Sequence, residues 1–123
     1  MIPFPGWDFF PDEDVHDLDE DVHDLDAAAR ERTLPLTHSV PARVPTDALP
    51  LSGGRHRVPV TLLMGGMDAD EVEHEVDQWG AYGEEFRAIA DASVVKIGSG
   101  HWPQFSQPQR LAELIVDAVA TTR

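Results

Sequence analysis

The sequence predicts an α/β fold built around a short parallel β-α-β-α unit. Two apolar runs, Val58–Met64 and Ser93–Ile97, have the length and composition of buried strands. A pattern of apolar residues at helical spacing follows each run. Because strand and helix alternate along the chain, the strands are expected to be parallel and joined by a right-handed crossover.

The chain ahead of this unit begins with an acidic segment. From Asp8 to Asp26 there are ten acidic residues and no lysine or arginine. Within that stretch, Asp14–Glu20 is repeated almost unchanged as Asp21–Asp26. The repeat places four apolar side chains on one stripe of a helix, those of Val15, Leu18, Val22 and Leu25. The sequence therefore predicts an acidic amphipathic helix that continues through Ala27–Ala29.

A proline-rich connection follows the acidic segment. Residues 33–59 contain five prolines and the pair Gly53-Gly54, a density of breakers that predicts a long irregular stretch. We therefore divide the chain into residues 1–57, an acidic helical segment with its proline-rich connection, and residues 58–123, the β-α-β-α unit.

The helix between the two strands is predicted from its spacing. Asp70 with Glu73 is similar to a capping box at its start, with aspartate in place of the usual serine or threonine. Gly80 and Gly83 are expected to divide its C-terminal half. The recurring apolar or small positions are Val72, Val76, Trp79, Gly83 and Phe86.

The last helix has the clearest amphipathic pattern. Ser106 with Gln109 predicts a capping box before it. Its apolar stripe comprises Leu111, Leu114, Ile115, Ala118 and Val119. Two strands do not make a stable sheet, since roughly three or more are needed. We therefore expect an incomplete sheet, whose exposed edge allows self-association unless another chain or further sequence covers it.

Composition excludes several classes of function. The formal net charge is -14, from 9 basic and 23 acidic residues, which opposes binding to nucleic acid. The chain has no cysteine, so disulfides and thiol chemistry are excluded. No apolar run is long enough for a membrane span, and the N-terminus does not have the pattern of a signal peptide. A cytoplasmic protein without membrane or nucleic-acid partners is expected.

Two residues follow the predicted strands at positions suited to chemistry. Asp68 comes after the first strand in Gly65-Gly-Met-Asp68, and His101 after the second in Gly98-Ser-Gly-His101. Ligands of open α/β sheets bind beyond the carboxyl ends of the strands. A carboxylate bound to one imidazole nitrogen fixes the tautomer that lets the other nitrogen act as a base. The alternative is that Asp68 only caps the following helix and His101 is a loop residue.

At these residues the sequence resembles the C-terminal end of an α/β-hydrolase. The resemblance covers Val58–Asp68, then Val94–Pro108 with its Gly100-His-Trp-Pro103 loop, then the last helix, and is nearest to esterases and hydroxynitrile-lyase-like members. It implies that Asp68 is the acid and His101 the base of a catalytic triad, with no cofactor or metal and with a small ester-like substrate. The N-terminal half, with Phe9-Phe-Pro-Asp12 at its start, resembles the rear of a cap over the active site. The expected fold is then an incomplete α/β-hydrolase fold.

One part of the family pattern is absent. The nucleophile motif G-x-S-x-G does not occur in the sequence. Ser52 lies in the irregular connection, and Ser99 is only two residues from His101. We therefore expect a chain that carries the triad acid and histidine but is inactive alone.

A second function class is a small acidic interaction or metal-binding module based on the repeat. His16 and His23 of the repeat lie two helical turns apart, about 10 Å, too far to share one ion. The acidic run also lacks the glycine of an EF-hand loop. A solvated acidic face is the simpler interpretation, and His74 is expected on the surface of the middle helix.

Overall fold

A two-stranded parallel sheet lies at the centre of the structure, a computed structural model that describes residues 1–10 and 24–121. Strands β1 (Val60–Met64) and β2 (Ala92–Lys96) pair in a register that sets Val60 beside Ala92 and Met64 beside Lys96. The predicted parallel unit is confirmed. β1 begins two residues later than expected, directly after Pro59, which has no N–H for strand pairing.

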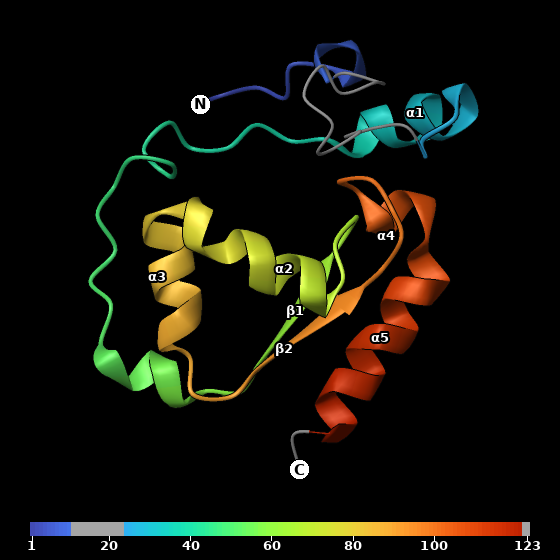
Figure 1. The fold of residues 1–123 in the computed structure, drawn as a ribbon. Coiled ribbons are helices and arrows are strands. Elements are labelled where there is room, and N and C mark those ends of the chain that lie inside the picture. Colours follow the sequence, from blue (N-terminus) through green and yellow to red (C-terminus); the bar gives the residue numbers. More distant parts are fainter. Residues whose placement is uncertain (11–23, 122–123) are drawn as a thin grey trace.

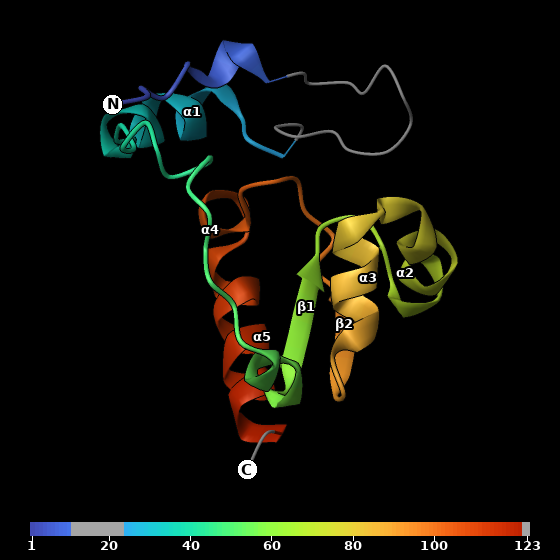
Figure 2. The ribbon, with the colours of Figure 1, turned by 90° about the vertical axis from the view of Figure 1, so that its left-hand side faces the viewer.

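Helices cover both faces of the sheet. α2 (Ala69–Glu75) and α3 (Ala81–Ala88), joined by a 3₁₀ turn at Val76–Trp79, form the layer on one face. α5 (Pro108–Thr121) forms the layer on the other (Figure 2). The architecture is therefore α/β, with one crossover between the strands. Within residues 1–10 and 24–121, no helix is both long and apolar enough to cross a membrane.

The helix between the strands starts two residues earlier than predicted. Asp68 caps α2, since its carboxylate accepts hydrogen bonds from the N–H groups of Asp70 and Glu71, both at 3.0 Å. The Glu71 carboxylate in turn accepts from the N–H of Asp68 at 2.7 Å and completes a capping box. The predicted box of Asp70 and Glu73 is wrong, because Asp70 already lies in the first turn of α2.

The two glycines of this region have different roles. Gly80 has a φ of 59° and separates the 3₁₀ turn from α3, as predicted. Gly83 does not break the helix but lies inside α3. A Cβ at Gly83 would come within 1.9 Å of the Val76 carbonyl oxygen, so this glycine lets α3 approach the preceding turn.

The start of the last helix also differs from the prediction. Ser106 ends the short helix α4 (Pro103–Ser106), and α5 begins at Pro108. The predicted capping box of Ser106 and Gln109 is therefore wrong. Pro103 and Pro108 each stand at the first position of a helix, where a proline has no N–H to lose and its fixed φ suits the helix.

The N-terminal segment lies beyond the carboxyl ends of both strands (Figures 1 and 2). It comprises a 3₁₀ turn at Trp7–Phe9, helix α1 (Ala27–Thr33) and a second 3₁₀ turn at Leu34–Leu36. α1 starts after Asp26, which has extended backbone angles and accepts from the N–H of Ala29 at 2.7 Å. The predicted helix therefore does not run through Asp26 unbroken. Residues 14–23 of the repeat, with His16 and His23, lie outside the described residues.

An aromatic cluster attaches this segment to the β-α-β-α unit. Trp7 is only 5% exposed, and its ring meets that of Trp102 edge-on at 5.1 Å. The indole N–H donates to the Arg30 carbonyl at 3.0 Å. The cluster contains residues from both sides of the division after residue 57, namely Phe4, Trp7, Phe10, Leu25, Ala29, Trp102 and Phe105.

The proline-rich connection is fixed at both of its ends. Near its start, Val40 pairs with Ile2 in a short antiparallel bridge, through hydrogen bonds of 2.7 and 2.9 Å. It then descends to a 3₁₀ turn at Gly53–Arg57, beside the amino end of β1 (Figure 2). There the Glu85 carboxylate of α3 accepts hydrogen bonds from Arg55 at 2.8 Å and from His56 at 3.0 Å.

We predict that Trp7→Ala lowers the free energy of unfolding by about 3–5 kcal/mol, the usual cost of truncating a buried aromatic residue. The variant loses the contact with Trp102 and the hydrogen bond to Arg30. Urea unfolding followed by circular dichroism measures the change. Phe9→Ala is the matched control, because Phe9 is 71% exposed and its removal should have little effect. Equal stabilities of the two variants would contradict the assignment of Trp7 to the core.

We predict that Glu85 makes the free energy of unfolding depend on pH in the acid range. Hydrogen bonds from Arg55, and secondarily from His56, lower the pKa of Glu85 from 4.5 to about 2. Because the folded-state pKa is depressed, this carboxylate stabilises the fold above about pH 4.5, and that contribution is lost as the pH falls towards 2. The difference in unfolding free energy between wild type and Glu85→Gln should therefore shrink from pH 5 to pH 2. Glu84→Gln, at the exposed neighbouring position of α3, is the matched control, and an equal trend in both variants would refute the explanation.

Candidate functional site at the carboxyl edge of the sheet

The loops that follow the two strands run side by side beyond the sheet. Strand-like pairing continues from Ile97 N–H to the Met64 carbonyl at 2.7 Å. The Gly65 carbonyl then accepts from the N–H groups of both Gly98 and Ser99, at 2.9 and 3.2 Å. A Cβ at Gly65 would lie 2.6 Å from the Ser99 carbonyl oxygen. The approach of the two loops therefore requires glycine at position 65, and both loops emerge at the same edge.

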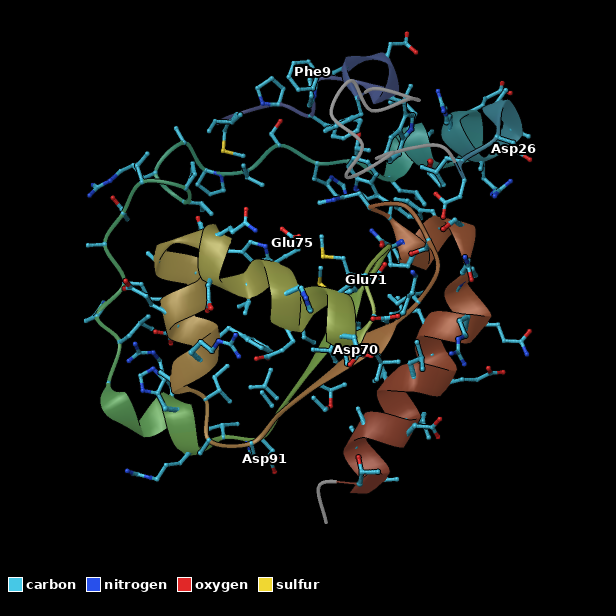
Figure 3. The ribbon with its side chains drawn as sticks, viewed as in Figure 1. Phe9, Asp26, Asp70, Glu71, Glu75 and Asp91 are labelled. Carbon is cyan, nitrogen blue, oxygen red and sulfur yellow. The ribbon has the colours of Figure 1, made fainter. Side chains whose placement is uncertain are left out.

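Asp68 lies on the first of these loops, with an exposed side chain. Both of its capping bonds use the same oxygen, Oδ1. The sequence left open the alternative that Asp68 caps the following helix. The structure confirms that Oδ1 of Asp68 has this capping role. Its capping partner Glu71 also forms an ion pair with Lys96 at the end of β2, with a distance of 3.3 Å between Glu71 Oε2 and Lys96 Nζ. Glu71 and Asp70 mark this end of α2 in Figure 3, whereas Asp91 lies at the opposite end of the sheet.

His101 lies on the second loop and is also exposed. Its ring packs against that of Trp102, with 5.1 Å between the ring centroids. Within the part of the chain that the structure describes, no hydrogen bond joins His101 to Asp68. The structure thus brings the two predicted residues to one edge of the sheet without a direct bond between them. Their role in catalysis stays a prediction.

Asp24 is a residue of this edge that the sequence did not single out. Its Oδ2 accepts a hydrogen bond from the N–H of Gly100, directly before His101, at 2.8 Å. Its Oδ1 is buried and has no hydrogen-bond partner among residues 1–10 and 24–121. Asp24 therefore ties the N-terminal segment to the histidine loop across 76 positions of sequence. Nothing in its local sequence distinguishes it from the other aspartates of the repeat.

Neither of the two serines considered as nucleophiles is positioned to attack a substrate beside His101. Ser99 is buried, and its hydroxyl donates to the neighbouring Gly100 carbonyl at 3.0 Å. Ser52 precedes the 3₁₀ turn at Gly53–Arg57, which lies beside the amino end of β1, at the opposite end of the sheet from His101. Neither serine has the strand-to-helix turn of a nucleophile elbow.

Histidines and carboxylates do not gather into a metal site in the described ranges 1–10 and 24–121. No group of three or more potential ligands occurs there. His74 is exposed on α2, as expected. The two predicted residues bring a carboxylate and an imidazole to this edge, beside two glycine-containing loops.

No protein-family model, curated protein or solved structure matches this chain. The resemblance to α/β-hydrolases therefore depends on the residues quoted from the sequence. The structure adds two parallel strands, a crossover through helices and a shared edge for Asp68 and His101, which together define a general α/β architecture.

Proposed function

We propose that this chain supplies the histidine and the acidic residue of an α/β-hydrolase-type acyl hydrolase. The observation that carries the proposal is the placement of Asp68 and His101 after the carboxyl ends of adjacent parallel strands, on loops that bind each other through the Gly65 carbonyl. This is the edge at which open α/β sheets bind their ligands. The nucleophile would come from a polypeptide segment outside residues 1–123.

In this proposal, His101 is the general base that takes the proton of a nucleophilic hydroxyl. The carboxylate of Asp68 accepts the N–H of the other ring nitrogen and stabilises the imidazolium. Capping of α2 occupies Oδ1 of Asp68, so this role falls to Oδ2. Triad hydrogen bonds are often long in unliganded enzymes and shorten when substrate binds, so a loose geometry is compatible with the role.

The N-terminal segment would serve as a wall of the substrate site. It lies beyond the carboxyl ends of the strands, and its aromatic side chains pack against Trp102, next to His101. The rings of Phe10 and Trp102 meet edge-on at 4.6 Å. An apolar wall beside an imidazole suits the acyl or alkyl part of a small ester-like substrate.

Although no hydrogen bond joins these two residues within the described part of the structure, we predict that Asp68 pairs with His101 in solution and fixes its tautomer. Neutral histidine that donates to a carboxylate through Nδ1 carries its proton there, so that Nε2 is unprotonated and can act as the base. In Asp68→Ser, the side chain still caps α2 but is too short to reach the imidazole, so the proton should move to Nε2. Nitrogen-15 NMR of the ring, recorded on the neutral imidazole, reports which of the two nitrogens carries the proton. Asp70→Ser is the control, and an unchanged tautomer in Asp68→Ser would refute the pairing.

The chain alone should not hydrolyse esters, because a base and its orienting carboxylate have no nucleophile to activate. We expect no turnover of p-nitrophenyl acetate above buffer and no labelling by a serine-directed fluorophosphonate probe. A serine esterase labelled under the same conditions controls for the reagent. Labelling that disappears in Ser52→Ala or Ser99→Ala would show that one of these serines is a nucleophile after all.

A further inference from the structure

Among the described residues, no strand lies beside the outer edge of β1. In a parallel pair, alternate residues bond to the partner, and here Val60 donates to the Asp91 carbonyl while Met64 accepts from Ile97. The backbone groups of Thr61 and Leu63 therefore point away from β2, towards an edge that the two-stranded sheet leaves open.

An apolar groove runs between this edge and α5. It has a volume of ≈260 Å³ and no charged residue among those that line it, namely Pro59, Thr61, Leu63, Ile115, Ala118 and Val119. Ile115 is 49% exposed and Val119 is 55% exposed, although both belong to the apolar stripe of α5. Open backbone groups beside an apolar groove are the two features that an added β-strand requires.

A segment of the same chain has the matching features. Leu49 and Leu51 of the proline-rich connection are 75% and 58% exposed. Residues 48–52 carry no charge, in a chain where 26% of the residues are charged. Among the described residues, neither Leu49 nor Leu51 makes a backbone hydrogen bond. The connection descends towards the amino end of β1 while β1 runs in the opposite direction, so the two segments are oriented for antiparallel pairing (Figure 2).

We propose that residues 48–52 dock on the open edge of β1 as a third, antiparallel strand. Pairing Leu49 with Leu63 and Leu51 with Thr61 directs the nitrogen of Pro50 outwards, where a proline is tolerated in an edge strand. Directly opposed side chains share a face, so Leu49 and Leu51 enter the groove and cover Ile115 and Val119. The carbonyl of Ser52 also faces outwards and keeps its hydrogen bond from Arg55.

The open edge of β1 is covered by this segment rather than by a second copy of the chain. Nine residues, 52–60, separate Leu51 from Thr61, which gives the segment a high effective concentration at the edge. A second copy would instead bring another net charge of -14 towards the first. Docking closes the edge to other strands, and release of residues 48–52 opens it. This inference does not depend on the proposed hydrolase function.

Hydrogen exchange of individual amides tests the proposal. In the wild-type chain, the amides of Thr61 and Leu63 should be protected from exchange, and Leu49→Asp with Leu51→Asp should remove about tenfold or more of that protection. The amide of Leu62, which faces β2, should keep its protection. Val44→Asp is the matched control. Val44 is 65% exposed, between the values for Leu51 and Leu49, and it lies on the connection outside residues 48–52.

The outcomes separate the alternatives. Unprotected amides at Thr61 and Leu63 in the wild type would overturn the proposal, as would protection that the double variant leaves unchanged. Protection that rises with protein concentration would assign the edge to a second copy and equally overturn it. As an independent measurement, Leu51→Cys with Thr61→Cys should oxidise to a monomeric disulfide, whereas Leu51→Cys with Leu62→Cys, on the opposite face, should not.

Discussion

The packing of Trp7 against Trp102 and Phe105 holds the first residues of the chain to the loop that carries His101. This attachment has to overcome repulsion, because the segment around it is acidic and the whole chain has a net charge of -14. Among the described residues, its contacts are ring packing and the hydrogen bond from the Gly100 N–H to the Asp24 carboxylate. Contacts of this kind are little affected by the salt that screens surface charges. The position of His101, next to Trp102, depends on them.

The core of the β-α-β-α unit could be predicted from the sequence because its signals are local. Short apolar runs bounded by glycine or proline identify both strands, and the alternation with helices fixes their parallel direction. The helix starts were harder to predict, because two acidic pairs at capping-box spacing overlap: Asp68 with Glu71 and Asp70 with Glu73. Which pair caps the helix depends on where the chain leaves β1 in three dimensions. That information is not present in the local sequence.

The candidate site could be predicted in part for the same reason. Topology alone brings the loops of Asp68 and His101 to one edge, since adjacent parallel strands end together. The contribution of Asp24 was not predictable, because its partner Gly100 is 76 residues away and the repeat offers several equivalent aspartates. The need for glycine at position 65 was not predictable either, because its close approach to Ser99 becomes visible only when both loops are placed.

The proline-rich connection is held at its two ends, so the backbone between them could be cut without loss of a buried contact. The bridge between Ile2 and Val40 and the aromatic cluster hold the described residues on one side of positions 41–52, and the contacts of Glu85 hold the 3₁₀ turn on the other side. All residues from 41 to 52 are exposed. A protease cut at the turn near Arg43 would therefore sever the backbone without removing a buried contact. Residues 1–40 would then behave as a peptide ligand of the remaining chain, bound through Trp7, and its affinity would measure directly how strongly the acidic segment is held.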